Sequence, residues 1–478
     1  MKDLDFINNY LDKNEAEFIK VSCEVWESAE LSYTESKSAA ALIKVLKEAG
    51  FEVEEGVAEM PTAFVAKFGS GSPVFGFLGE YDALDILSQE AGNPVKTPIK
   101  EGAPGHGCGH NLLGVGAMAA AIAAKEYMVA ENLQGTVYYY GCPAEEGAGS
   151  KQFMARAGVF DGVDFVYTWH PADSNEVQWE RSVSIMGANF EFNGITAHAG
   201  GTPWLGRSAL DAAELMSSGC NYLREHMMDQ ERIHYAYMDA GGTAPNVVQE
   251  HALVKYEVRS PKVVDLKKLF ERVVDVARGA ALMTGTTMNY EVTMAFSDYI
   301  PNHAMAEIAE ECLHEVGVPK WDDDDYKLAA QFLNSFTPNT VEAIKTKIVD
   351  RYGADNLEAV LEKPLASNIS PFNAELVKYA SGSTDVGDVC YAAPTIQYRV
   401  ATTCIGNVGH SWQMTAQSNS RIGHKGMMVA AKAMALAALR TMNRPDVIEA
   451  AKKVVLQQNG GSYQCPVPDS VSPPIGRY

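Results

Sequence analysis

Residues 104–111, Pro-Gly-His-Gly-Cys-Gly-His-Asn, follow an apolar strand and precede a predicted helix of small residues that runs from Leu112 to about Met128. Cys108 and His110 place a soft sulfur ligand and an imidazole one residue apart, in a glycine-rich turn that can bend around an ion. On its own, a Cys-x-His pair is weak evidence for metal binding. The stretch nevertheless indicates an α/β unit whose loop carries metal-ligand chemistry.

The segments on either side extend the α/β pattern. Residues 74–79, VFGFLG, are nearly all apolar, as in a strand buried on both faces. Helices are expected over 14–27 and 36–49, and further strands near 51–55, 63–68, 136–140 and 165–169. The alternation predicts an α/β catalytic domain with a mixed sheet and helices on both faces.

Acids, histidines and the cysteine follow the strands at their C-terminal ends. In open α/β sheets this edge is where ligands bind, so we expect these side chains to converge. The residues concerned are Asp82, Cys108, His110, Glu145, Glu146 and His170.

The pattern changes over residues 183–298. Its predicted strands and helices follow the order β-α-β-β-α-β, the ferredoxin-like split unit. We therefore expect an α+β lid or dimerisation domain at 183–298, inserted into a catalytic, metal-binding domain made of residues 1–182 and 299–478.

The C-terminal part offers one more candidate ligand. His410 follows an expected strand at 395–400, and it is favoured over His424, which lies at the start of a predicted helix over 424–441. Residues 321–380 are expected to be mostly helical, with a solvated acidic run at 322–325. No role is predicted for residues 315–380 or for the proline-rich tail from Pro466.

Composition narrows the classes of partner. At 478 residues the chain is too long for one core, and a formal charge of −22 argues against nucleic acid or an anionic membrane. The N-terminus lacks a secretory pattern, and no apolar run reaches the roughly 18 residues of a membrane span. We expect a cytoplasmic protein whose eight scattered cysteines are mostly reduced.

The candidate ligands Cys108, His110, Glu146, His170 and His410, with Glu145 beside them, suit two divalent ions that share one site. Such a pair polarises a carbonyl and lowers the pKa of a bridging water. In the pair Glu145-Glu146, one carboxylate can bind metal while the other acts as general base and then as acid for a leaving amine.

These motifs resemble the M20 metallopeptidase/amidohydrolase family, in particular its aminoacylase-like branch, which includes hydrolases of p-aminobenzoyl-glutamate. The resemblance covers most of the chain. It rests on Gly107–His110, Pro143–Glu146, His170, Gly194–His198, Gly242–Val248 and Gly409–His410.

The resemblance implies a role for each residue. Cys108 would bridge two metal ions (Zn or Mn), with His110, Glu146, His170 and His410 as the other ligands and Glu145 as the base. His198 would stabilise the oxyanion in the site of a neighbouring subunit, and Asn246 and Arg259 would bind the substrate's α-carboxylate. Asp82 and His106 are candidates to orient the metal ligands through hydrogen bonds. The implied assembly is a homodimer, with a paralogous subunit as an alternative partner.

Two departures from the family pattern concern His110 and the groups that would set its strength as a metal ligand. Peptidase branches have a histidine where this chain has Glu80, so His110 must supply that ligand. Many aminoacylase-like members have aspartate where this chain has Asn111, which puts the tuning of His110 in question.

The expected substrate is an N-acyl amino acid resembling p-aminobenzoyl-glutamate, or alternatively a dipeptide or an amino acid with a non-aromatic acyl group. Tyr81 and Trp204 are candidates for an aromatic acyl pocket. Two other functions stay open: a thiol hydrolase with Cys108 as nucleophile, and a non-catalytic metal-binding protein. The free carboxylate of Glu145 favours the metal-dependent enzyme.

Overall fold

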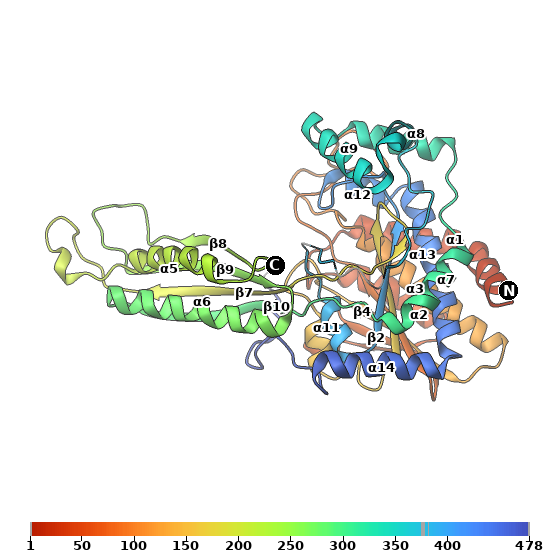
Figure 1. The fold of residues 1–478 in the computed structure, drawn as a ribbon, viewed down its shortest axis with the longest axis horizontal. Helices are drawn as coiled ribbons and strands as arrows, with labels where there is room; N and C mark the ends of the chain where they lie inside the picture. The colour runs from red at the N-terminus through yellow and green to blue at the C-terminus, as the bar shows by residue number, and fades with distance from the viewer. Residues whose placement is uncertain (1, 374–377, 381, 477–478) are drawn as a thin grey trace.

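A computed structural model describes residues 2–373, 378–380 and 382–476. Figure 1 shows a large body built on one sheet, and a narrower body, coloured yellow to green, that extends away from it. The narrower body is formed by the elements from β7 (Ser184–Asn193) to β10 (Thr287–Phe296). The mixed α/β fold class predicted from the sequence is confirmed.

The large sheet has seven strands in the order β1-β2-β4-β3-β5-β11-β6. Strands β3, β4, β5 and β11 run parallel, while β1, β2 and β6 pair antiparallel at the two sides. The bounds are β1 Glu52–Glu55, β2 Phe64–Ser70, β3 Val74–Glu80, β4 Gly135–Cys142, β5 Phe165–Ala172, β6 Glu176–Val177 and β11 Thr395–Ala401.

Side chains alternate between two cores on the faces of this sheet. Phe75 and Phe77 of β3 belong to the core cluster beneath α3 and α13, whereas Leu78 belongs to the cluster that includes α4 and α11. Both faces are therefore apolar, as the continuous apolar runs predicted. The helices of the first face are α1 (Lys2–Ser28), α2 (Ser36–Glu48), α3 (His110–Ala130), α7 (His303–Val316) and α13 (Arg421–Met442); those of the second are α4 (Lys151–Arg156) and α11 (Val386–Ala392).

Helix α3 needs small residues because it lies directly on the sheet. A Cβ atom on Gly114 would lie 2.5 Å from the carbonyl oxygen of Glu80. The helix is long and apolar enough, by length and composition, to cross a membrane, although Lys125 and Glu126 interrupt its apolar run. Most of it is buried inside the protein, which is typical of a core helix.

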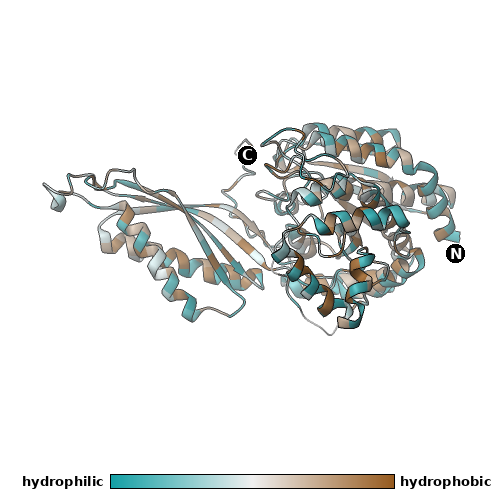
Figure 2. Ribbon diagram, turned by 90° about the horizontal axis from the view of Figure 1, so that it is seen from above, coloured by the Kyte–Doolittle hydropathy of each residue, from teal (hydrophilic) through white to brown (hydrophobic). Residues whose placement is uncertain are grey.

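The small sheet has the order β10-β7-β9-β8, all antiparallel, with β8 at Arg232–Asp239 and β9 at His251–Ser260. Helices α5 (Ala209–Leu223) and α6 (Val263–Thr284) lie on one side of it (Figure 2). This is the predicted ferredoxin-like arrangement. Its β7–α5 and β8–β9 loops lie at the end farthest from the large sheet, which we call the distal end (Figure 1).

Three helices, α8 (Asp323–Asn334), α9 (Pro338–Tyr352) and α10 (Leu357–Glu362), form a module that packs on the 404–416 segment. The acidic run at 322–325 pairs with Arg421 and Lys425. Residues 374–377, within the predicted helical stretch 321–380, lie outside the described residues, as does residue 381. Helices α12 (Trp412–Ser418) and α14 (Pro445–Asn459) precede an irregular tail.

Candidate metal centre

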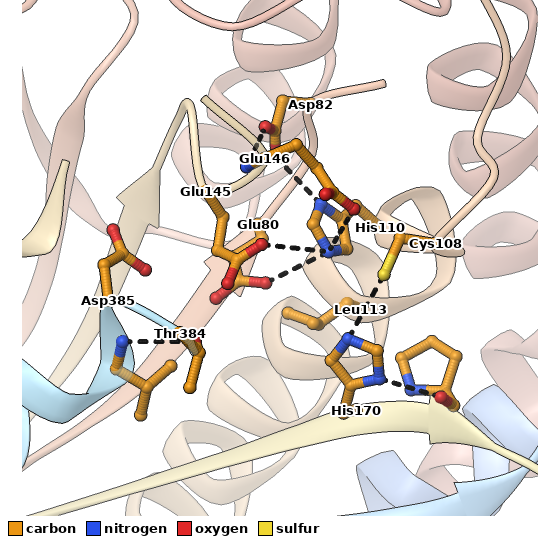
Figure 3. A network of polar contacts seen from close by, with 12 residues as sticks. Glu80, Asp82, Cys108, His110, Leu113, Glu145, Glu146, His170, Thr384 and Asp385 are labelled. Atoms are coloured by element: carbon orange, nitrogen blue, oxygen red, sulfur yellow. Dashed lines mark hydrogen bonds and ion pairs between the residues drawn. The ribbon is translucent and has the colours of Figure 1, made fainter. Parts of the chain in front are cut away.

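The C-terminal edge of the large sheet brings together the side chains that the sequence predicted to converge (Figure 3). Glu80 ends β3 and Asp82 follows it, while His110 begins α3. The loop after β4 carries Glu145 and Glu146, and His170 lies near the end of β5. Because β3, β4 and β5 are parallel neighbours, their C-terminal ends open onto the same place.

Two groups of possible ligands share Cys108. Donor atoms of Cys108, His110 and His170 lie within 4.8 Å of one another, as do those of Cys108, Glu146 and His410. Two three-residue groups with one thiol in common have the spacing that two ions sharing Cys108 would need, and the ligand assignment stays a prediction. A further group at this spacing contains Glu80, His110 and Glu145.

His110 is fully buried, and Asp82 fixes its orientation. Nδ1 of His110 lies 2.8 Å from a carboxylate oxygen of Asp82, so Nδ1 donates to Asp82 and Nε2 faces the other candidate ligands. Although burial opposes it, the charges of Cys108 and Asp82 raise the pKa of His110 well above its usual value, so a cation would take the place of the proton on Nε2. The other Asp82 oxygen accepts the backbone N–H of Glu146 at 2.9 Å. Asp82 thus contacts two candidate ligands at once, and its role in orienting metal ligands stays a prediction. It also orients His110 without an aspartate at position 111.

His170 has the geometry of a neutral ligand. Its Nδ1 lies 2.8 Å from the carbonyl oxygen of Pro171, and its Nε2 lies 3.4 Å from the sulfur of Cys108. Burial, together with the charge of His110, lowers the pKa of His170 to about 4. A neutral imidazole with Nδ1 tied to a carbonyl presents the lone pair of Nε2 to a cation.

Glu146 and His410 close the site from the other side. Nε2 of His410 lies 3.3 Å from a carboxylate oxygen of Glu146. Burial of Glu146 would raise the pKa of its carboxyl group, but the hydrogen bond from His410 and the charge of His110 outweigh burial and lower this pKa to about 2. The backbone N–H of His410 donates to the carbonyl of Gly107 at 2.9 Å. His410 itself has a φ of 53°, in the left-handed region that non-glycine residues seldom occupy.

The turn before the glutamate pair is also held in a left-handed conformation, with a φ of 62° at Ala144. The backbone N–H of Ala144 donates to the buried carboxylate of Glu35 at 2.9 Å, and the hydroxyl of Thr62 donates to the same carboxylate at 2.9 Å. Burial, then the charge of Asp82, raises the pKa of Glu35 to about 8. Glu35 braces this turn, a role that the sequence did not predict because a glutamate before a helix is ordinarily solvated.

Glu145 borders a buried ionic cluster made of Glu80, Lys151 and Asp385, and Figure 3 shows the two carboxylates of this cluster near Glu145. The ammonium of Lys151 lies 2.7 Å from Glu80 and 2.6 Å from Asp385, and its side chain has no exposed surface. Burial, followed by the charges of Glu80 and Glu146, raises the pKa of Glu145 well above its usual range. A carboxyl group with a raised pKa suits transfer of a proton in both directions near neutral pH.

The residues present fit divalent cations. Two buried atoms, Nε2 of His110 and Oε1 of Glu146, make no hydrogen bond to the described residues. Burial and the charge of Glu146 raise the pKa of the Cys108 thiol well above its usual value, opposite to what an unassisted thiolate nucleophile needs. Sulfur, imidazole and carboxylate groups whose buried atoms lack hydrogen-bond partners form a site that suits a divalent cation.

His198 lies in the β7–α5 loop and Asn246 in the β8–β9 loop. Both loops are at the distal end of the small domain, away from this cluster (Figure 1). The two loops are joined, since the N–H of Ala199 donates to the carbonyl of Asn246 at 2.9 Å. Nδ1 of His198 accepts the N–H groups of Gly200 and Gly201 at 3.1 and 3.0 Å, so the ring proton sits on the exposed Nε2. His198 is therefore a hydrogen-bond donor that has no substrate site beside it within this body.

Arg259 lies at the opposite end of the small domain, where it donates to the hydroxyl of Ser383 at 3.0 Å. One chain therefore does not bring Asn246 and Arg259 together. His106 contacts α1 through the carbonyl of Val25 at 3.1 Å instead of a candidate ligand.

The remaining candidates lie outside the metal cluster. His424 pairs with Asn419 at 3.2 Å, and burial lowers its pKa to about 4. Tyr81 is fully buried and donates to the carbonyl of Thr62 at 2.5 Å, so it does not line an open pocket. Trp204 is 70% exposed, at the distal end.

The fold and the edge cluster together define a two-domain metallohydrolase, and comparison with known proteins gives the family. Residues 76–337 match the model of peptidase family M20/M25/M40, and the chain belongs to this family. It is accordingly a hydrolase that acts on amide bonds, in a family that uses divalent metal ions.

Among curated relatives, the chain is 39% identical to one of the subunits of p-aminobenzoyl-glutamate hydrolase from Escherichia coli (strain K12), over 98% of each chain. It is 27% identical to Xaa-Arg dipeptidase of Mus musculus, over 91% of this chain and 87% of that one. Among solved structures, aminobenzoyl-glutamate utilization protein from Klebsiella pneumoniae aligns with a TM-score of 0.60 at 18% identity, over 91% of this chain and 98% of that one. A dinuclear metal binding peptidase of the M20 family from Bacillus subtilis aligns with a TM-score of 0.59 at 17% identity, over 90% and 99%. These structures support the fold.

Proposed function

We propose that this protein is a dinuclear metal-dependent amidohydrolase that cleaves the amide bond of an N-acyl amino acid resembling p-aminobenzoyl-glutamate. The observation that carries the proposal is the pair of ligand groups joined at Cys108, with the carboxyl group of Glu145, which belongs to neither group, beside them. The 39% identity to a hydrolase named for p-aminobenzoyl-glutamate supports this substrate class.

Cys108, His110 and His170 would hold one ion, and Cys108, Glu146 and His410 the other. Bound divalent ions would polarise the amide carbonyl and lower the pKa of a bound water. Glu145 takes a proton from the water as its oxygen adds to the carbonyl carbon, and then delivers it to the amine nitrogen as the C–N bond breaks. The products are a carboxylic acid and an amino acid.

The substrate's free carboxylate is the expected partner of Arg259 and Asn246, and the oxyanion that of His198. The proton on the exposed Nε2 of His198 fits donation to an oxyanion. His198 and Asn246 lie at the distal end, so they would serve the site of a second subunit. The most exposed aromatic side chain there, Trp204, is a candidate contact for an aromatic acyl group.

The edge of the small sheet offers a surface to which a second subunit can bind. Strand β8 pairs with β9 alone and forms an edge of the small sheet, with Tyr235 and Tyr237 about two-fifths exposed. An unpaired edge with apolar side chains is suited to pairing with another strand. We infer a homodimer through the small domain, with a paralogous partner as the alternative, since the relatives include two different subunits of p-aminobenzoyl-glutamate hydrolase from the same organism.

The decisive experiment replaces Glu145 by Gln and measures bound metal and hydrolysis of p-aminobenzoyl-glutamate on the same sample. Metal content should stay at the wild-type level while kcat falls at least 10²-fold, because only the proton-transfer group is removed. Retained hydrolysis would contradict the role of Glu145. Wild-type activity that resists chelators but is abolished by Cys108→Ala would favour the thiol hydrolase, and no hydrolysis of any amide by the metal-loaded wild type would favour a binding protein.

A second candidate substrate is a dipeptide, which the likeness to a dipeptidase favours. Comparing kcat/KM for p-aminobenzoyl-glutamate, aliphatic N-acyl-glutamates and Xaa-Arg dipeptides distinguishes the two. The proposal expects the aromatic acyl substrate to be preferred.

A further inference from the structure

The helical module α8–α10, which had no predicted role, packs against the loop that carries His410. The N–H of Ile405 donates to the carbonyl of Pro364 at 2.8 Å, and the amide of Gln413 donates to the hydroxyl of Ser335 at 3.3 Å. Ile344 of α9 lies directly over Gly406, where an added Cβ would approach it to 2.3 Å. The module therefore contacts the chain on both sides of His410, at Ile405 and Gly406 before it and at Gln413 of α12 after it.

A chain of polar contacts joins this module to a second ligand loop. Arg351, at the end of α9, donates to a carboxylate oxygen of Asp173 at 3.1 Å. The other oxygen of Asp173 accepts the backbone N–H of Gly406 at 2.8 Å. One carboxylate is thus held between a guanidinium and a backbone amide.

The contact between Asp173 and Gly406 matters because each residue lies close in sequence to a candidate metal ligand. Asp173 follows His170 by three residues, and Gly406 precedes His410 by four. His170 and His410 belong to different ligand groups, which meet at Cys108. The contact between Asp173 and Gly406 therefore fixes the separation of a ligand of one group from a ligand of the other.

His410 depends on such outside support more than the other candidate ligands do. Its side chain is 58% exposed, whereas those of His110 and Glu146 are 0% and 8% exposed. Its backbone is left-handed, and its loop is irregular between β11 and α12. A conformation of this kind persists only when surrounding contacts determine it.

We propose that Arg351 is a positioning residue that acts through Asp173 to set the His410 loop against the His170 loop, and that the α8–α10 module serves to hold it there. The inference rests on the proposed function, because it concerns the geometry of the proposed metal ligands. Arg351 touches none of those ligands itself.

The test is Zn²⁺ binding to the metal-free full-length protein, followed by competition with a chromophoric chelator, for the wild type, Arg351→Gln, Arg351→Lys and His410→Ala. Arg351→Gln should weaken one of two binding steps by about tenfold, within the range seen for groups behind metal ligands. Arg351→Lys keeps a donor for Asp173 and should stay within about threefold of the wild type. In the His410→Ala background, Arg351→Gln should add nothing, because both act on the same ligand.

Kinetics provide a second readout. At saturating Zn²⁺ the kcat of Arg351→Gln should return to within about twofold of the wild type, because occupancy and not the chemistry is affected. The matched control is Lys345→Gln on the same helix, which removes an exposed pair with Glu342 and should change neither binding step. The Arg351 side chain is itself 39% exposed, so folding should tolerate its replacement, and thermal unfolding of the metal-free forms checks this.

Each outcome bears on one of the two proposals. Two wild-type binding steps that Arg351→Gln leaves unchanged, or weakens equally, would overturn the positioning role while the proposed function stands. An additive loss in the His410→Ala background would also overturn it. A wild-type protein that takes up no metal would overturn the proposed function, and the inference with it.

Discussion

The C-terminal edge of the large sheet and the distal end of the small domain differ sharply in how complete they are. At the edge, His110 and Lys151 have no exposed side-chain surface, and most neighbouring groups already have a fixed partner. At the distal end, His198 and Asn246 are exposed and face no ligand site of their own body. On the proposed function, one chain would complete cation binding, whereas substrate recognition would be left for a second chain to complete.

The largest effect is expected when one residue of each region is replaced and the two variants are compared. Cys108→Ala removes the shared member of both ligand groups, so bound metal should fall below one ion per chain and kcat/KM should fall by at least 10³-fold. His198→Ala should keep full metal content while kcat falls by about 10²- to 10³-fold, as for loss of one oxyanion donor. Metal analysis and steady-state kinetics on the same preparations measure both.

Mixing two inactive variants tests whether the sheet edge of one chain works with the distal end of another. A metal-free Cys108→Ala chain has an intact distal end, and a His198→Ala chain has an intact metal edge. If the two regions act across subunits, combining the two inactive variants should restore part of the wild-type activity. Mixed dimers that remain inactive would show that both regions serve the same chain.

The second prediction concerns the stability of the edge. Lys151→Met leaves the buried carboxylates of Glu80 and Asp385 without their cation, which should lower the free energy of unfolding by about 3–5 kcal/mol. Removing one of these charges as well, in Lys151→Met/Asp385→Asn, should recover part of the loss. Denaturant titration measures this, with the exposed Lys345→Met as control. A change under about 1 kcal/mol in Lys151→Met would mean that the cluster relaxes or takes up water.

The convergence at the edge could be predicted from the sequence because each candidate ligand follows a strand. The ends of parallel strands share one edge, so Cys108, His110, Glu146 and His170 could be expected to meet there without coordinates. Their assignment as ligands stays a prediction. The ferredoxin-like order of the small domain was equally predictable, since its hydrophobic period switches between strand and helix.

The supporting groups could not be predicted in the same way. Lys151 and Glu35 are residue types that normally remain in water, and nothing in the sequence indicates that tertiary packing buries them. Arg351 and Asp173 are 178 residues apart, so only the folded chain brings their side chains together. Tyr81 failed as a pocket residue because it lies directly after β3 and turns into the same core cluster as Phe75 and Phe77.

The third prediction tests the orientation of ligands at the edge. Asp82→Asn replaces a charged acceptor of His110 with a neutral amide, so the affinity for metal should drop by about 10- to 100-fold. Isothermal titration of the metal-free protein with Mn²⁺ measures the change. Asp85→Asn, three residues away on an exposed loop, is the control. Unchanged affinity would mean that the tautomer of His110 does not depend on Asp82.

The smallest effect is expected in the small domain, where His251 lies between Asp239 and Glu191 at 2.7 and 3.0 Å. Only the charged imidazolium can donate to both carboxylates, and these hydrogen bonds raise the pKa of His251 above its ordinary value. The stabilisation is therefore fully present below about pH 6.5 and is lost as the pH rises through the higher pKa of the folded state. Because the side chain is 36% exposed, His251→Gln should cost only a few tenths of a kcal/mol at about pH 6 and less at about pH 9.

Denaturant titration at the two pH values tests this, with metal affinity recorded alongside. Asp239 also accepts the backbone N–H of Gly241 at 2.8 Å, at the start of the loop that carries Asn246. His251→Gln should therefore raise KM slightly while leaving metal affinity untouched, because the loop that bears the substrate contact loosens and the sheet edge does not. A change in metal affinity of more than about twofold would mean that the two regions are coupled within one chain, and the division between them would have to be abandoned.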